Sequence, residues 1–323
     1  TMKLYTITHG AASHVSFVPL EEGAVEFTSI SIDDYVRNII KTNACSTIGI
    51  KYELGDVYVS TAYPSGTQLE IFNNYNESAY GDFCKNVLNI DLDEKYNCSR
   101  TINIDGVKTR VYAMMKPFVK TPNITISTTK IPPETLTKQT IPDEMFDEIV
   151  HNNFMIVGAS GSGKTYLTNY LLNKFIRDDE RIAIIEEFGE LIAPNDLTQS
   201  IIVPPPKPGE PSLLKFVTEQ SNLMRLDAIY VGEVKSGEAW PMVINMASGT
   251  RGGFTMHGET ADQALSRLRA LCKLSCDNDE AINEFIAKSI KYIIVMEKKN
   301  IKQILKMTGT VMKNNFAKQE IGS

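Results

Sequence analysis

The pattern of apolar and polar positions divides the chain into two parts. In the first part, short β-branched runs in which apolar and polar residues alternate, such as residues 57–61 and 109–113, are separated by turn residues. Two helical patterns interrupt these runs: one begins after Ser31, a good N-terminal cap, and one spans Tyr80 to Leu88. The combination predicts an α+β domain, which we place at residues 1–128.

In the second part, apolar strands alternate with helical patterns. Strands are predicted at residues 153–157, 181–185 and 228–231, and helices at residues 165–177, 238–247 and 261–272. Such alternation is typical of a mostly parallel sheet with helices on both faces, so the fold class predicted for residues 143–323 is α/β. Between the two parts, residues 129–142 contain three prolines and almost no apolar periodicity, which indicates a linker.

The composition fits a soluble globular protein of two domains. The 323 residues exceed what one hydrophobic core usually supports, and 42% of them are hydrophobic against 22% charged. No apolar run approaches the ~18 residues of a membrane-spanning helix, and the N-terminus shows no secretion signal, so we expect a cytoplasmic protein. Five irregularly spaced cysteines agree with reduced thiols, and Cys272 and Cys276 are interpreted as helix-packing residues rather than metal ligands.

Charge is distributed unevenly along the chain. The net charge of −6 does not favour a protein that coats nucleic acid, and no basic, aromatic-rich element indicates a nucleic-acid site. Residues 288–318, however, contain eight lysines and one acidic residue, and their apolar pattern predicts a hairpin around Lys298 and Lys299. These lysines either keep a strand edge solvated or contact an anionic lipid, an acidic partner or a neighbouring subunit. Both interpretations stay open at this point.

The clearest chemical signal is a phosphate loop between a predicted strand and a predicted helix. It fits G-x-x-x-x-G-K-[ST] and consists of Gly158, Ala159, Ser160, Gly161, Ser162, Gly163, Lys164 and Thr165. Its glycines let backbone N–H groups surround phosphate oxygens, and the start of the following helix adds a positive dipole end. Lys164 is expected to contact the β- and γ-phosphates and Thr165 to bind Mg²⁺, so a nucleoside triphosphate such as ATP is the predicted ligand.

Acidic residues at the ends of two predicted strands are candidates for the chemistry of that ligand. Glu186 and Glu187 follow one strand and Glu233 follows the other. The carboxyl ends of parallel strands face the ligand-binding crevice of an open α/β sheet. We assign Glu233 as the base that polarises the attacking water, and we expect one of the acids to hold Mg²⁺ through water. Glu190 is as consistent with a solvated helix residue as with the site.

Four motifs in a fixed order carry a resemblance to a known family. After the phosphate loop come residues 185–190, residues 225–239 and a glycine-rich run that ends at His257, followed by residues 264–268. On residues alone, a single histidine is more often structural than catalytic. The succession, however, resembles the Walker A, Asp box, Walker B and His box motifs of the secretion ATPase superfamily of type II and type IV systems. It is nearest to the VirB11-type traffic ATPases of type IV secretion and conjugation, with Tad and pilus motors as neighbours.

The resemblance implies a fold, an activity and partners. It implies a RecA-like P-loop ATPase domain after the N-terminal domain, and a homo-oligomer, a hexameric ring, at the cytoplasmic face of the inner membrane. There, together with inner-membrane components, ATP hydrolysis would power substrate transfer or pilus assembly. Within the motifs, the resemblance assigns Glu186 and Glu187 to the Asp box, with Glu187 reaching Mg²⁺ through water. It assigns Glu233 to the Walker B motif and His257 to a catalytic His box.

Two lysines depart from the family pattern. Arg110 resembles the first of two arginines that N-terminal domains of this family bring to the nucleotide phosphates, but Lys130 stands where the second is expected. Lys235 likewise replaces an arginine after the Walker B glutamate. Lysine is a point charge without the bidentate fork of arginine. The alternative interpretations are therefore a ring-forming structural module that binds nucleotide with little turnover, and a type IV pilus or Tad assembly ATPase.

Overall fold

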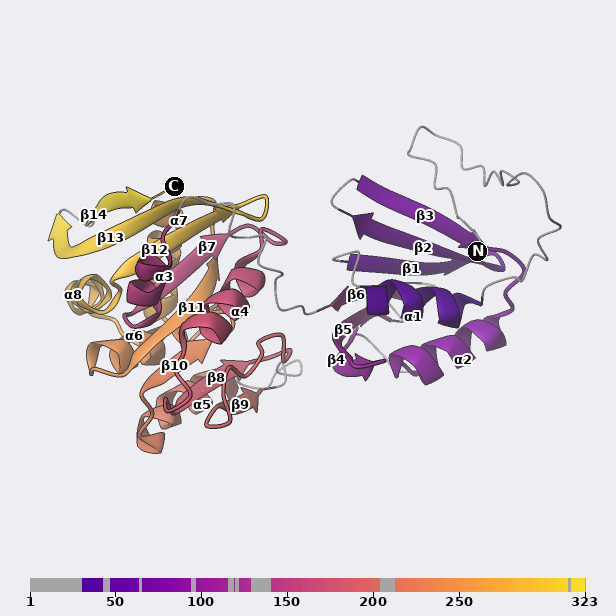
Figure 1. Ribbon diagram of the computed structural model, residues 1–323, viewed down its shortest axis with the longest axis horizontal. Coiled ribbons are helices and arrows are strands. Elements are labelled where there is room, and N and C mark those ends of the chain that lie inside the picture. The colour runs from indigo at the N-terminus through magenta and orange to yellow at the C-terminus, as the bar shows by residue number, and fades with distance from the viewer. Residues whose placement is uncertain are drawn as a thin grey trace. The chain divides into compact units, whose positions relative to one another are not determined.

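The chain folds into two compact units, residues 1–130 and residues 131–323 (Figure 1). The computed structural model describes residues 31–42, 47–63, 66–93, 97–115, 119, 122–128, 141–203, 213–312 and 315–322. The predicted linker at residues 129–142 lies outside the described residues except for its last two positions, so the domain boundaries within it stay a prediction. We describe each unit by itself.

The first unit is an antiparallel sheet with two helices. Its six strands have the order β3-β2-β1-β6-β5-β4. The elements are α1 (Ile32–Thr42), β1 (Thr47–Glu53), β2 (Asp56–Tyr63), β3 (Gly66–Phe72), α2 (Glu77–Leu88), β4 (Asn97–Ile104), β5 (Val107–Met114) and β6 (Asn123–Thr128). Alternate strand residues, among them Ile48 and Ile50 of β1, are buried in one core that also includes apolar residues of α1 and α2. The predicted α+β character of this part is therefore confirmed.

Local side-chain bonds fix where the two helices begin. The Ser31 hydroxyl accepts the Asp34 N–H at 3.0 Å at the start of α1, as its position in the sequence predicts. At α2, the Asn76 side chain accepts the Ala79 N–H at 2.8 Å. This helix ends at Asn89, which adopts the left-handed conformation that closes many helices. Both helical patterns predicted in the first part are present.

The second unit is built around an eight-stranded sheet of order β14-β13-β12-β7-β11-β10-β8-β9. Its strands are β7 (Phe154–Gly158), β8 (Ile182–Glu186), β9 (Gln199–Ile202), β10 (Ala228–Val231), β11 (Arg251–His257), β12 (Tyr292–Glu297), β13 (Asn300–Met312) and β14 (Asn315–Gly322). Its helices are α3 (Asp143–Val150), α4 (Lys164–Phe175), α5 (Leu213–Gln220), the 3₁₀-helix η2 (Ser221–Met224), α6 (Ala239–Ala247), α7 (Ala261–Cys272) and α8 (Asp279–Ser289). From β12 to β9 every pairing is parallel, whereas β13 and β14 add antiparallel strands at one edge. This is the predicted α/β class with a mostly parallel sheet.

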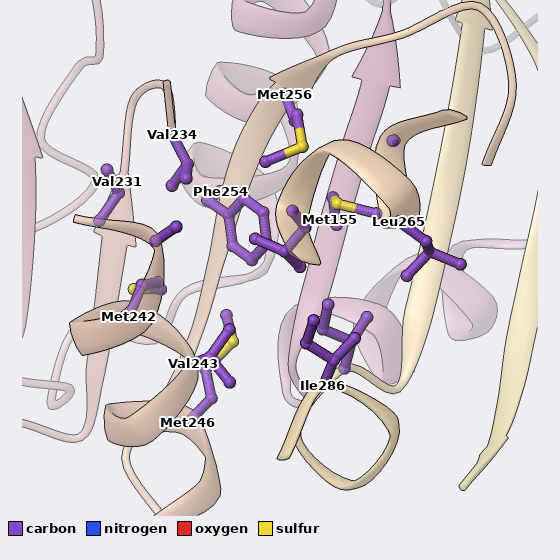
Figure 2. Close-up of a cluster of buried hydrophobic side chains, with 14 of the residues drawn as sticks. Met155, Val231, Val234, Met242, Val243, Met246, Phe254, Met256, Leu265 and Ile286 are labelled. Atoms are coloured by element: carbon purple, nitrogen blue, oxygen red, sulfur yellow. The ribbon is translucent and has the colours of Figure 1, made fainter. Parts of the chain in front are cut away.

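Two hydrophobic cores cover the two faces of this sheet. Along β7, Phe154 and Ile156 belong to a core formed with α3 and α4, whereas Met155 and Val157 belong to a second core formed with α6, α7 and α8. Figure 2 shows part of the second core, where methionine sulfur atoms lie around the Phe254 ring. The central strands read as continuous apolar runs because both of their faces are covered.

Cys272, at the end of α7, is fully buried in the second core, and burial raises the pKa of its thiol to about 12. Its position in the core is that of a helix-packing residue, as predicted.

In the described parts of the chain, no helix has the length and apolar character needed to cross a bilayer.

Strand β11 was not predicted, because its glycines are more typical of a loop. An added Cβ at Gly252 would lie 2.0 Å from the Ile229 carbonyl oxygen of β10. At Gly253 it would lie 2.4 Å from the Phe154 ring of β7. Glycine is therefore required here by close packing between neighbouring strands, and the run that precedes His257 is a central strand of the sheet.

We predict that Gly252→Ala destabilises the second unit. The added methyl group meets a backbone oxygen that cannot move aside, so the free energy of unfolding should fall by about 2–3 kcal/mol. Urea unfolding can be followed by the fluorescence of Trp240, the single tryptophan, which lies in α6. Gly237→Ala is the matched control: its Cβ would meet the flexible Lys215 side chain at 3.3 Å, and the expected change is within about 0.5 kcal/mol. Equal losses in the two variants would contradict the packing requirement.

Candidate functional site

The parallel register brings the sequence-predicted residues to one edge of the second sheet. Strand β7 ends in the phosphate loop, β8 ends at Glu186, β10 is followed by Gly232 and Glu233, and β11 ends at His257. In the sheet register, His257 lies opposite Gly158, the first residue of the loop. Because these strands are parallel, their carboxyl ends share the edge at which open α/β sheets bind ligands.

The phosphate loop encloses the side chain of Lys164. The ammonium group donates to the carbonyl oxygens of Gly158 and Ala159 at 2.9 and 3.0 Å, and the residue is only 8% exposed. Burial lowers its pKa, while the nearby charges of Glu233 and Glu190 oppose that shift. A phosphate oxygen would offer this ammonium a charge-assisted bond in place of neutral carbonyls.

Backbone conformation in the loop explains its glycines. Gly161 and Gly163 have φ values of 72° and 99°, which residues with a Cβ rarely adopt. A Cβ at Gly158 would lie 2.8 Å from the Met296 carbonyl oxygen of β12. Helix α4 begins at Lys164, within the last residues of the loop, so its N-terminal N–H groups and dipole favour an anion here. Among the described residues, the Ser162 hydroxyl oxygen is buried without a hydrogen-bond partner.

Glu233 and His257 form a direct pair beside the loop. Nε2 of His257 lies 2.8 Å from Oε1 of Glu233, and both side chains are about one third exposed. Burial lowers the pKa of His257, the charge of Lys164 lowers it further, and Glu233 opposes both. The imidazole is therefore held toward its neutral form, in which it donates one hydrogen bond. The structure thus brings together Glu233, the predicted base, and His257, the histidine of the predicted His box.

The two acids at the end of β8 have different surroundings. The Glu186 carboxylate is buried and accepts the backbone N–H groups of Glu190, at 2.7 Å, and Leu191, at 3.0 Å. These bonds fix the loop after β8 and indicate a positioning role for Glu186, whose catalytic role stays a prediction. Glu187 instead lies 2.5 Å from the Lys235 ammonium, which also lies 5.6 Å from the centre of the Phe188 ring. The lysine that departs from the family pattern therefore neutralises an Asp-box glutamate.

Glu190, which the sequence left undecided, is the acid that contacts the phosphate-loop threonine. The Thr165 hydroxyl donates to its carboxylate at 3.4 Å. Asn169 of α4 holds the same loop: its amide nitrogen donates to the Glu190 carbonyl at 3.0 Å and its oxygen accepts the Ile192 N–H at 2.9 Å. Asn169 is 1% exposed and was missed by sequence reasoning. The sequence does carry one signal for it: a polar amide residue at a position of the predicted helix that the apolar periodicity assigns to the buried face.

Glu238 is a second residue that sequence reasoning missed. It is fully buried, and its carboxylate accepts the N–H groups of Lys235 and Ser236 at 2.5 and 2.8 Å. These bonds hold the loop that carries Glu233 and Lys235. Glu238 stands directly before α6 but makes no capping bond to that helix, so no helix-cap pattern in the sequence indicates this role.

Two of the residues predicted to contact the phosphates are not part of the described second unit. Arg110 lies in β5 of the first unit, and Lys130 lies outside the described residues. Their contacts with nucleotide stay predictions.

The lysine-rich segment at residues 288–318 forms the predicted hairpin, but four of its ammonium groups are paired with acids. The pairs are Lys288–Glu284, Lys302–Glu297, Lys306–Glu148 and Lys318–Asp262.

The sequence matches a known family over the second unit. A profile described as "Type II/IV secretion system protein" matches residues 127–318, more than half of the chain. Among curated proteins, the type IV secretion system protein VirB11 of Bartonella henselae is 38% identical over 125 residues. The match covers 38% of this chain and 35% of that protein, so the alignment spans about a third of the relative's length.

Solved structures share the fold. The ATPase DotB of Legionella pneumophila matches with a TM-score of 0.58 at 15% identity, over 93% of this chain and 82% of that chain. The pilus retraction motor PilT, solved with bound ADP, matches with a TM-score of 0.56 at 14% identity, over 90% and 82% of the two chains. At these identities the similarity extends to the fold alone, and it agrees with the RecA-like class expected from the sequence.

The environment of His257 leads to a test by titration. We predict that its pKa lies below the usual 6.5, because burial and Lys164 both disfavour the imidazolium. Glu233→Gln should lower it further by removing the favourable carboxylate, whereas Lys164→Met should raise it. Histidine signals followed by NMR from about pH 5 to 8 can be assigned by their loss in His257→Gln, with His151 as an internal control. A rise on Glu233→Gln would show that the pair does not form.

Proposed function

Because the chain belongs to the type II/IV secretion system protein family, we propose that it is an ATPase motor of a type IV, conjugation-type secretion system. The observation that carries this proposal is the Glu233–His257 pair at the mouth of the phosphate loop, next to Lys164. A loop that binds phosphates and a carboxylate able to position or deprotonate the attacking water are parts that nucleotide hydrolysis requires. The whole fold supports the same family of motors.

The residues of the phosphate loop fit a nucleoside triphosphate, and we assign ATP as the ligand. Gly158 to Gly163 supply backbone N–H groups, and Lys164 supplies the cation for the β- and γ-phosphates. The buried Ser162 hydroxyl in the same loop supplies a further polar group. The first unit contributes Arg110, and Lys130 in place of an arginine, as further phosphate contacts in this proposal.

The oxygen donors beside the loop fit a hard divalent cation. Hydroxyl and carboxylate oxygens are the ligands that Mg²⁺ prefers, and the Thr165 hydroxyl lies 3.4 Å from the Glu190 carboxylate. We therefore assign Thr165 as a direct ligand and Glu190 as the nearer carboxylate. Glu187, the acid expected to act through water, is engaged by Lys235 and is the alternative candidate. When bound, Mg²⁺ would neutralise charge on the phosphates.

Glu233 and His257 carry the proton chemistry in this proposal. Glu233 accepts the proton of the water that attacks the γ-phosphorus, and the bond between that phosphorus and the β,γ-bridging oxygen breaks. Neutral His257 donates a hydrogen bond to Glu233, which orients the carboxylate. Because His257 also interacts with Lys164 and with the Gly158 backbone, it is placed to respond to the presence of the γ-phosphate.

We assign the motor to a homo-oligomer, a hexamer, that acts with inner-membrane components at the cytoplasmic face of that membrane. Anionic-lipid contact through residues 288–318 is weakened by the ion pairs that already engage four lysines. A second candidate is a ring-forming module that binds nucleotide with little turnover. It is favoured by the Glu187–Lys235 pair, because Lys235 is engaged by an acid where the family pattern has an arginine. A third candidate function for the same site is that of a type IV pilus or Tad assembly ATPase.

The first test is Lys164→Ala. Removing the ammonium that the loop encloses should abolish ATP hydrolysis and weaken nucleotide binding at least about tenfold, since charged phosphate contacts are lost. Lys174→Ala is the matched control: this exposed lysine lies on the same helix, is paired with Asp143 and should leave both quantities unchanged. Hydrolysis is measured as phosphate release over a range of protein concentrations. Persistent activity in Lys164→Ala would exclude this site, whereas binding without turnover in the wild type would favour the second candidate.

A second test concerns the metal. Glu190→Gln should raise the Mg²⁺ concentration needed for half-maximal hydrolysis several-fold, by about 1 kcal/mol, because the carboxylate nearest Thr165 loses its charge. Glu219→Gln, an exposed acid on α5, is the control and should not change that concentration. The measurement is phosphate release during Mg²⁺ titration at fixed ATP. An unchanged Mg²⁺ requirement in Glu190→Gln, with a raised one in Glu187→Gln, would return the metal contact to Glu187.

A further inference from the structure

The turn between β12 and β13 has an unusual composition for its shape. Glu297 pairs with Asn300, so the connection consists of Lys298 and Lys299 alone. Both lysines adopt the left-handed conformation, with φ values of 50° and 66°. Two-residue turns of this kind favour Asn and Gly, because both central residues need a positive φ and most other residues adopt it only at a cost in conformational energy. Two lysines at these positions therefore call for an explanation beyond the turn itself.

This turn is attached to the outside of the phosphate loop. The Lys299 N–H donates to the Ser162 carbonyl oxygen at 3.0 Å. An added Cβ on Gly163 would lie 3.4 Å from the Cα of Lys299, so the two backbones are in contact. Gly163 is the residue directly before Lys164 and the N-terminus of α4. The turn and the phosphate loop thus form one backbone assembly, and the loop cannot move far without the turn.

The two turn lysines are exposed and form no ion pair within the described chain. Lys291 shares this property, whereas four other lysines of residues 288–318 are engaged in ion pairs with acids. The pair with Lys302 lowers the pKa of Glu297, and the charge of the neighbouring Lys298 helps to lower it. A lysine side chain extends about 6 Å from its Cα, so a group anchored beside Gly163 can reach over the loop.

We propose that Lys298 and Lys299 form a second cationic element of the nucleotide site and contact the polyphosphate from the Gly163 side of the loop. This inference rests on the proposed function, since it assigns two more residues to the same ligand. Lys164 binds the phosphates from inside the loop, whereas the turn lysines bind them from outside and stay solvated when no nucleotide is present. Their contribution is therefore electrostatic and weakens as salt rises.

The test is binding of a fluorescent ADP analogue with Mg²⁺ to the full chain, at low and at moderate salt. Lys298→Gln with Lys299→Gln should weaken binding about tenfold at low salt and reduce its salt dependence, and arginine at both positions should restore it. Inorganic pyrophosphate should compete with the analogue less effectively in the glutamine variant. Lys288→Gln, which removes an exposed lysine of α8 that is paired with Glu284, should bind as the wild type does.

A second variant separates charge from folding. Lys298→Asn with Lys299→Gly suits the turn better and keeps the backbone bond to Ser162, so it should retain the melting temperature and still bind about tenfold more weakly. Wild-type binding of either lysine-free variant, within a factor of two at low salt, would overturn the inference. If the wild-type chain itself does not bind the analogue and Lys164→Ala changes nothing, the proposed function fails instead. The two failures are thus distinguishable in one experiment.

Discussion

The site depends on the close packing of β11 between β7 and β10. Only glycine fits at positions 252 and 253, because the Ile229 carbonyl and the Phe154 ring occupy the space a Cβ would take. This packing sets the register that puts His257 opposite Gly158 and beside the loop that follows β10. The two glycines near the start of β11 therefore determine where the Glu233–His257 pair at its end will lie. A shift of one residue would turn His257 to the other face of the sheet.

Buried polar groups then shape the loops that the sheet leaves open. Glu186 fastens the loop after β8 and Glu238 fastens the loop after β10, each by binding backbone N–H groups. Asn169 ties the first of these loops to α4. Because their bonds are internal, these residues hold Glu190 and Glu233 in position and leave those carboxylates directed toward the phosphate loop. An acid at such a site is thus either a part of the loop's scaffold or free for its chemistry, and the two are separated by whether the carboxylate binds backbone N–H groups, as in Glu186 and Glu238.

Features that depend on local chain geometry could be predicted from the sequence. The phosphate loop, the apolar strands and the helix after Ser31 each follow from residues within a few positions of one another. Strand β11 could not be predicted, because the need for glycine comes from Ile229 and Phe154, which are distant in the chain. The same limit applies to the acids after β8. Which of these acids faces Thr165 depends on the hydrogen bonds of the loop's N–H groups, and the apolar periodicity of the sequence carries no information on those bonds.

The balance of charge at the site explains why the proposed nucleotide would need an accompanying cation. Around Lys164 the structure places two carboxylates, Glu233 and Glu190, and each of them stabilises the ammonium form of that lysine. A triphosphate bound in the loop, as proposed, would compete with these acids for the Lys164 ammonium and would be repelled by both of them. Additional positive charge would therefore have to arrive with the ligand or lie at the rim of the loop. The oxygen donors beside Thr165 suit a divalent cation that arrives with the ligand, and the exposed lysines of the β12–β13 turn are the proposed second source.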